Sequence, residues 1–250
     1  MARRLAVVTV ALALLAAPAW ATSSASSWAL PQIRVVVAHG LMARSVKTFR
    51  PNDPLTRGDL ASLSAGLGEQ KVPATPPADA SAPVTMTGLD AGLVRALGLS
   101  DSAYRFYLGA RSAGLKPPSR FGNEVAARLL QLRTNHPAGQ DDLELLPTDR
   151  ATRAEAAYSA ARVLGFSGWE IESARQESLD FSLPMLTPWQ TRVLQTAVKF
   201  IGFPYVWGGE SETTTSPYGA QAQGGFDCSG FVWRVYKLQS YPGGVRSRPR

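Results

Sequence analysis

The sequence of 250 residues predicts a mostly α-helical fold built from helix-turn-helix repeats. Apolar residues recur at helical spacing along much of the chain, as at Ile33, Val36 and Val37. Thr residues that can cap a helix precede several of these segments, with an acidic residue or Gln three positions later. One such block occurs twice in the chain, which indicates repeated helical units.

The net charge of the chain indicates which kinds of partner the protein can bind. Lys and Arg total 26 against 19 Asp and Glu, which gives a formal charge of +7, or +5 without Arg3 and Arg4. A modest positive excess suits an anionic partner such as a cell-wall polymer. The basic residues are scattered and are not clustered with aromatic residues, so we do not expect nucleic-acid binding.

Residues 1–21 have the pattern of a secretory signal peptide. Arg3 and Arg4 form its charged start, an apolar run follows, and Ala19-Trp20-Ala21 is a small-x-small cleavage site. The run is too short for a stable membrane span, although an uncleaved anchor is the alternative. We therefore expect a secreted protein of the cell wall or the extracellular space, with no membrane partner after cleavage.

The helical region is expected over residues 31–165, after a flexible Ser/Ala-rich leader at residues 22–30. Its first helix should end near Gly40, because glycine commonly terminates helices. A second helix should begin after Thr56, whose hydroxyl can form a capping box with Asp59.

The block at residues 51–65 matches residues 147–161 without gaps. The matched pairs include Pro51 and Pro147, Asp53 and Asp149, Thr56 and Thr152, Arg57 and Arg153, and Asp59 and Glu155. This pattern resembles S-layer-homology repeats. The resemblance implies helical units that pack in threes and hold secreted proteins to anionic wall polysaccharide. A plain helical domain whose caps happen to repeat is the alternative.

A middle copy of the repeat is expected to be degenerate or absent. Residues 86–133 are helical in pattern but lack a Pro…Thr-Arg block, and Val72 to Val84 has the composition of a linker or an exposed loop. The two histidines belong to this half of the chain, His39 at a helix end and His136 in a loop. Neither has a second ligand at metal-binding spacing, so we assign no metal and no cofactor.

Residues 166–186 are expected to be a connector in which Trp169 and Phe181 pack. A helix should then begin after Thr187, which can form a capping box with Gln190. Its expected buried face consists of Val193, Leu194, Ala197, Val198 and Ile201. Gly202 should end this helix.

The stretch from Pro204 to Leu238 contains the chain's single cysteine, Cys228. Asp227 is a good N-cap, so Cys228 should lie in the first turn of a helix, at the head of a buried stripe that includes Val232 and Tyr236. The unpaired amides and dipole there favour the nucleophilic thiolate. On spacing alone, a small buried core residue is the favoured interpretation. A redox-sensing thiol is a weaker alternative because no resolving cysteine exists.

The blocks Pro-Tyr-Val-Trp-Gly-Gly, at residues 204–209, and Gly-Phe-Asp-Cys-Ser-Gly-Phe-Val resemble the nucleophile region of NlpC-type cell-wall peptidases. These are papain-like cysteine hydrolases that cut peptidoglycan stem peptides. The resemblance implies that Cys228 is the nucleophile and that Tyr205 is a donor at the mouth of the site. It also implies that Asp227 and Ser229 contact the stem peptide. Helix capping for Asp227 and Ser229, and aromatic packing for Tyr205 and Trp207, are the alternatives.

The chain departs from this family at the base. In the papain-like order a histidine on a later strand follows the cysteine, and none follows Cys228. We therefore expect residues 187–250 to form only the first, helical part of an α+β papain-like domain, without its sheet. The expected function is a secreted peptidoglycan endopeptidase, anchored by its repeats, in an inactive, truncated form. A non-catalytic cell-wall-binding protein is the alternative.

Overall fold

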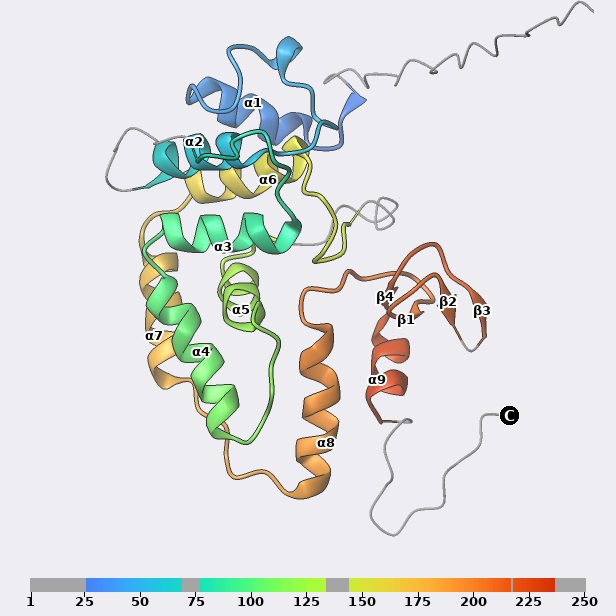
Figure 1. The fold of residues 1–250 in the computed structure, drawn as a ribbon. Helices are drawn as coiled ribbons and strands as arrows, with labels where there is room; N and C mark the ends of the chain where they lie inside the picture. Colours follow the sequence, from blue (N-terminus) through green and yellow to red (C-terminus); the bar gives the residue numbers. More distant parts are fainter. Residues whose placement is uncertain (1–25, 69–76, 134–143, 217, 237–250) are drawn as a thin grey trace, which may run out of the picture.

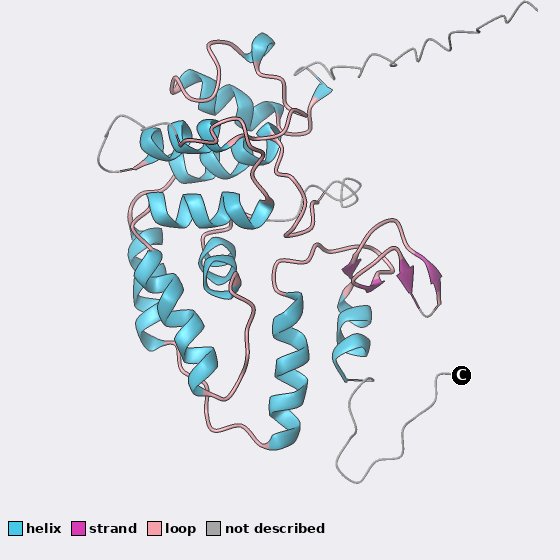
Figure 2. Cartoon of the chain, viewed as in Figure 1, coloured by secondary structure: helices cyan, strands magenta, loops and turns pink. Residues whose placement is uncertain are grey.

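The computed structural model describes residues 26–68, 77–133, 144–216 and 218–236. The expected signal peptide and His136 lie outside these ranges. The described residues are mostly helical, as the sequence predicts (Figures 1 and 2). The helices are α1 (Leu30–Ala38), α2 (Arg57–Leu67), α3 (Met86–Ala96), α4 (Ser100–Ser112), α5 (Phe121–Leu129), α6 (Arg153–Leu164), α7 (Trp169–Asp180), α8 (Pro188–Ala197) and α9 (Cys228–Tyr236). None of the described helices is long and apolar enough to cross a membrane.

Three helices begin from equivalent Thr caps. Thr56 caps α2 in a complete capping box with Asp59, as predicted. Thr152 caps α6 by accepting a 3.2 Å hydrogen bond from the Glu155 amide. Thr85 caps α3 in the same way, with a 3.1 Å bond from the Gly88 amide. The third cap, which the sequence pattern did not reveal, indicates a third unit.

The three loops before these caps close a ring of backbone hydrogen bonds. The Leu55 amide donates to the Ala151 carbonyl at 2.8 Å, Ala151 donates to Val84 at 2.8 Å, and Val84 donates to Leu55 at 2.9 Å. All three side chains are buried. Each loop therefore donates one backbone hydrogen bond to a second loop and accepts one from the third. The units are related by an approximate threefold arrangement.

This ring decides between a degenerate and an absent middle copy of the repeat. The middle copy is present, and its loop ends at Val84, in the segment for which we expected a linker or an exposed loop. It is degenerate because Thr85-Met86 stands where the flanking copies have Thr-Arg. The amide of Met86 donates to the Asp149 carbonyl at 2.9 Å, as the amide of Arg57 donates to Ala82. The backbone arrangement thus persists without the arginine.

The remaining helices of this region extend the repeat core. α1 packs on α6, α5 packs on α3, and α4 lies against α5 and α7 (Figure 1). The expected connector thus contains helix α7. Phe181 packs on Phe106 with ring centroids 5.4 Å apart, as predicted. Trp169 does not pack as predicted, because 67% of it is exposed at the first turn of α7.

The C-terminal part begins with α8, which has the predicted capping box between Thr187 and Gln190. It continues through a 3₁₀ turn at Val198–Phe200 to Gly202, whose φ is +86°. Four two-residue strands then form two antiparallel pairs. They are β1 (Glu210–Ser211) with β4 (Gly225–Phe226), and β2 (Thr215–Ser216) with β3 (Gly219–Ala220). α9 follows β4 directly and packs against β1 and α8.

Candidate functional site

The two sequence blocks that carry the peptidase resemblance lie side by side in the structure. Tyr205 forms a parallel bridge with Phe226. The Val206 amide donates to the Phe226 carbonyl at 3.1 Å, and the Phe226 amide donates to the Pro204 carbonyl at 3.2 Å. Because Phe226 stands two residues before Cys228, this pairing brings the first block next to the start of α9.

A glycine contact seats α9 against the first block. A Cβ atom on Gly230 would lie 1.9 Å from the Gly209 carbonyl oxygen, so no side chain fits there. The Gly209 carbonyl in turn accepts a 2.9 Å hydrogen bond from the Asp227 amide. The backbone of the helix start therefore rests directly on the Gly-Gly turn. A Cβ atom on Gly209 would likewise lie 2.7 Å from the Gly225 carbonyl oxygen, so both positions require glycine.

Cys228 is the first residue of α9 and its thiol is exposed. The expected burial of this residue at the head of an apolar stripe is therefore wrong. Val235 is buried, but Val232 is 54% exposed and Tyr236 is also exposed. The interpretation of Cys228 as a small core residue fails for the same reason. An exposed thiol at a helix N-terminus has the position that a nucleophile needs.

Asp227 caps α9 through its carboxylate. One oxygen, Oδ1, accepts from the Gly230 amide at 2.6 Å and from the Ser229 hydroxyl at 2.8 Å. The other, Oδ2, accepts from the Gly208 amide at 3.1 Å. These hydrogen bonds, first of all that from Gly230, hold the pKa of Asp227 below its usual range. The geometry supports helix capping for Asp227 and Ser229, and their contact with a stem peptide stays a prediction.

The aromatic residues of the first block differ in their surroundings. Tyr205 is half-buried within the strand-like pairing with Phe226. Trp207 is 84% exposed, so aromatic core packing is ruled out for it. The core beneath the site is formed by Phe226 with Phe200 and Phe203, whose ring centroids lie 4.8 and 6.1 Å from that of Phe226. The cysteine region thus has a small aromatic core of its own.

His39 lies far from the cysteine. It follows α1, which Figure 1 draws at the top of the molecule, whereas α9 is at the lower right. Its Nδ1 atom is 2.9 Å from the Val35 carbonyl within the same helical turn. Among the described residues, no histidine therefore lies near Cys228.

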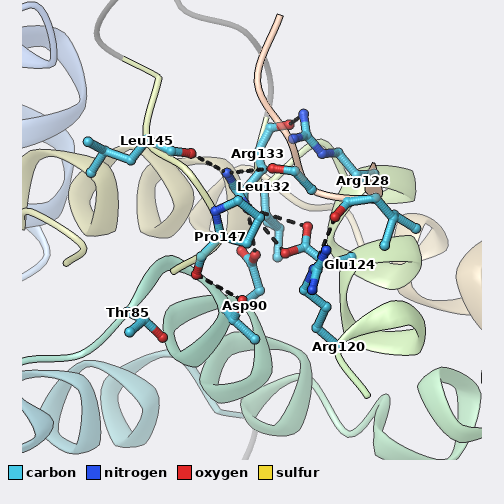
Figure 3. A network of polar contacts seen from close by, with 12 residues as sticks. Thr85, Asp90, Arg120, Glu124, Arg128, Leu132, Arg133, Leu145 and Pro147 are labelled. Carbon is cyan, nitrogen blue, oxygen red and sulfur yellow. Dashed lines mark hydrogen bonds and ion pairs between the residues drawn. The ribbon is translucent and has the colours of Figure 1, made fainter. Parts of the chain in front are cut away.

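A buried charge network joins the peptidase-like segment to the repeats (Figure 3). Arg133, directly after α5, donates to Glu124 at 3.2 Å and lies 3.4 Å from Asp90 on α3. Its Nη2 also donates to the Gly202 carbonyl at 3.2 Å and to the Leu145 carbonyl at 2.9 Å. The network therefore fixes the point at which the chain leaves α8 for the cysteine region.

Arg120 adds a second attachment at the same place. Its Nε donates to the Ile201 carbonyl at 3.1 Å and its Nη2 to the Lys199 carbonyl at 2.6 Å. Within α8 itself, Gln195 exchanges hydrogen bonds of 2.6 and 3.0 Å with the backbone of Lys116. The sequence pattern gave no signal for these contacts, because each joins residues that are distant in the chain.

Within this network, the carboxyl group of Asp90 has a strongly raised pKa. It is fully buried, and burial raises the pKa of its carboxyl to about 8, partly offset by Arg133. Its Oδ1 atom has no hydrogen-bond partner among the described residues. One arginine thus faces two buried carboxylates, so a proton on Asp90 leaves Arg133 paired with Glu124.

The repeat arginines have different environments. Arg153 is used internally, because it donates to the carbonyls of Phe49 and Met42 and to Asp59, with its guanidinium over the Phe49 ring. Arg57 is more than half exposed and pairs with Asp79. It lines a groove of about 630 Å³ between α2 and α3, which we call the α2–α3 groove. That groove also contains Ser64, Thr85 and Arg95.

Comparisons with known proteins agree with both halves of this description. The model of the NlpC/P60 family matches residues 202–242, and that of the S-layer homology domain matches residues 21–61. A relative is the gamma-D-glutamyl-L-lysine dipeptidyl-peptidase of Bacillus subtilis (strain 168), 39% identical over 49 residues. That match covers 20% of this chain and 13% of the relative. No solved structure matches.

The resemblance of the two segments to these families, inferred above from their motifs, is therefore confirmed. The matches indicate a peptidase-like protein that is associated with the cell wall. Because the chain matches so little of the dipeptidyl-peptidase, any activity, substrate or partner of this protein is a proposal.

Proposed function

We propose that this protein is a secreted cell-wall hydrolase in two parts, with residues 1–21 as its signal peptide. The helical region at residues 31–165 binds anionic wall polysaccharide. The segment from residue 187 onward carries Cys228, which attacks an amide bond of a peptidoglycan stem peptide. The observation that carries this proposal is the close pairing of the two motif blocks, which leaves the Cys228 thiol exposed at a helix N-terminus.

The chemical step requires the thiolate form of Cys228, because the thiolate is the nucleophile. The Cys228 sulfur attacks the amide carbonyl carbon, a C–S bond forms, and the C–N bond breaks as the departing amine takes a proton. Water then hydrolyses the thioester, which releases a carboxylate and restores the thiol. A base must accept the thiol proton, and His39 is engaged with the Val35 carbonyl of its own helix.

The wall-binding half is supported by the α2–α3 groove. Arg57 and Arg95 give it positive charge, and the Ser64 and Thr85 side chains add hydroxyl groups. Guanidinium groups bind carboxylates and phosphates with paired hydrogen bonds, so the groove suits an acidic sugar or a phosphate of a wall polymer. The ion pair between Arg57 and Asp79 is exposed, so an anionic ligand can replace Asp79 at little cost.

Two measurements on the full chain test the proposal. The first is sedimentation with purified sacculi that retain their polysaccharide, in which Arg57→Ala should weaken binding. The second is the release of new amino groups from peptidoglycan; Cys228→Ala should abolish any release that the unaltered chain shows, without changing wall binding. Hydrolysis that persists in Cys228→Ala would refute the role of this thiol.

A non-catalytic wall-binding protein is the second candidate. It is favoured by the position of His39, which supplies no base to Cys228. In this case the full chain would sediment with sacculi and release no amino groups, and Cys228→Ala would behave like the unaltered protein. Absence of sedimentation by the unaltered chain would contradict both candidates.

A further inference from the structure

A second cleft lies on the other side of α3, between this helix, α4 and α5. We call it the α4 cleft; its volume is about 400 Å³, and its lining includes the side chains of Arg95, Ser100, Tyr104, Tyr107, Ser119 and Asn123. Its floor is rigid, because a Cβ atom on Gly122 would lie 1.9 Å from the Ala103 carbonyl oxygen. The backbones of α4 and α5 are therefore in direct contact below the cleft, which is formed before any ligand arrives.

The polar side chains of the α4 cleft keep their full hydrogen-bonding capacity. Within the part of the chain that the structure describes, Arg95, Ser100, Ser119 and Asn123 form no side-chain hydrogen bond or ion pair with the protein. A guanidinium, two hydroxyls and an amide thus line one cleft without protein partners. A ligand with several hydroxyl groups can bond to all four.

Two tyrosines supply an aromatic wall. Tyr104 is 61% exposed, and Tyr107 lies three residues later on the same face of α4. The guanidinium of Arg111 lies 5.9 Å from the centroid of the Tyr107 ring. An aromatic face beside unpaired polar groups suits a sugar ring, whose C–H face packs on the aromatic ring while its hydroxyls form hydrogen bonds.

The α4 cleft adjoins the α2–α3 groove. Arg95 and Ala91, on α3, line both of them. A polymer that occupies the groove can therefore reach the cleft by passing Arg95. The described lining of the cleft contains one cation and no carboxylate, so it favours a sugar with an acidic group.

We propose that the α4 cleft is a second subsite for the polymer bound in the α2–α3 groove, and that it takes a saccharide unit with an acidic substituent. This inference rests on the proposed wall-polysaccharide binding. Tyr104 packs on the sugar ring, Arg95 pairs with the acidic group, and Asn123 bonds to hydroxyls.

The test uses the full chain and, as the probe, anionic polysaccharide released by acid from purified sacculi, with affinity measured by titration calorimetry. Tyr104→Ala should weaken binding roughly three- to tenfold, because an aromatic stacking contact is lost. Tyr104→Phe keeps the ring and should retain most of the affinity. Trp169→Ala, which removes another exposed aromatic residue away from the cleft, should leave binding unchanged.

Asn123→Ala gives an independent reading of the same cleft and should also weaken binding. If Arg57→Ala weakens binding while Tyr104→Ala and Asn123→Ala do not, the second subsite is wrong and the groove proposal stands. If the unaltered chain does not bind this polysaccharide, both proposals fail. If Tyr104→Ala weakens binding only to sacculi from which the polysaccharide has been removed, the cleft binds peptidoglycan and the inference is wrong.

Discussion

The Gly202 carbonyl accepts a 3.2 Å hydrogen bond from Arg133, which belongs to the core of the repeat region. Gly202 also packs so closely on Glu124 that a Cβ atom would lie 2.6 Å from its carboxylate. The peptidase-like segment is therefore joined to the repeats at a buried charge and does not hang from an exposed linker. The direction in which α9 presents Cys228 depends on this joint.

Replacing Gly202 tests the joint. Gly202→Ala should destabilise the fold by more than about 2 kcal/mol, because positive φ strain and overpacking against Glu124 add together. Gly114→Ala is the matched control: its φ is +82°, and no atom lies within 4 Å of the added Cβ, so only the backbone term of about 1 kcal/mol applies. Urea unfolding measures both, and equal losses would contradict the close packing at Gly202.

Asp90→Asn should alter the pH dependence of stability. The pKa of Asp90 is raised to about 8 in the folded state, so the folded protein binds a proton that the unfolded chain releases near pH 4. As the pH rises from about 4 to about 8, the unaltered protein should therefore lose stability relative to the variant, by up to about 1.4 kcal/mol per pH unit. The difference between the two should level off above pH 8.

Urea unfolding at three pH values within this range measures the effect. A constant difference between the unaltered protein and Asp90→Asn would show that Asp90 is ionised in the folded state. Arg133→Met is the complementary variant, because it leaves Glu124 buried without its cation. It should cost roughly 3–5 kcal/mol.

The two repeat arginines should differ in their effect on stability. Arg153→Ala removes hydrogen bonds to two carbonyls and to Asp59, and should cost about 2–4 kcal/mol. Arg57→Ala removes one exposed ion pair and should cost less than about 1 kcal/mol. Thermal unfolding monitored by circular dichroism compares them. The expectation fails if the order is reversed.

The role of Asp227 can be separated from that of a substrate contact. Asp227→Ala should loosen the first turn of α9 by about 1 kcal/mol, whereas Asp227→Asn keeps an acceptor and should retain most of the cap. The rate of Cys228 alkylation by iodoacetamide reports on this turn. A stem-peptide contact is supported instead if Asp227→Asn leaves alkylation unchanged but weakens binding of stem peptides.

The lowered pKa of Asp227 sets the acid limit of this cap. A carboxylate whose folded-state pKa is lowered contributes stability above its unfolded pKa, and loses it as the pH falls through the folded value. The stability difference between the unaltered protein and Asp227→Ala, measured by urea unfolding, should therefore persist until the pH is below the usual range for Asp. Loss of the cap at or above pH 4 would contradict the hydrogen-bonding pattern.

The parts of the fold that local chemistry determines could be predicted from the sequence. Thr56 with Asp59, and Thr187 with Gln190, form the expected capping boxes, because these contacts span only three residues. The two peptidase blocks could likewise be joined in advance, since their glycines and aromatics follow a family pattern.

The parts that depend on distant contacts could not be predicted. The sequence could not decide whether the middle repeat is degenerate or absent, because Met86 replaces the arginine of its motif, while its backbone bonds to Asp149 and Leu55 leave no mark on local spacing. The exposure of Cys228 and Val232 was missed because helical periodicity identifies an apolar stripe without showing which partner covers it. The ion pairs of Arg133 with Asp90 and Glu124 could not be predicted either, because periodicity does not show which side chains meet in the fold.

The closed loop of amide contacts through Leu55, Val84 and Ala151 has a consequence for how the protein is made. While the ribosome is still adding the middle of the chain, the amide of Leu55 can donate only to water, because its partner in the ring is the carbonyl of Ala151. The ring of hydrogen bonds therefore cannot close within the first two units alone. We therefore expect the ring to be completed only after the third of the three loops has emerged.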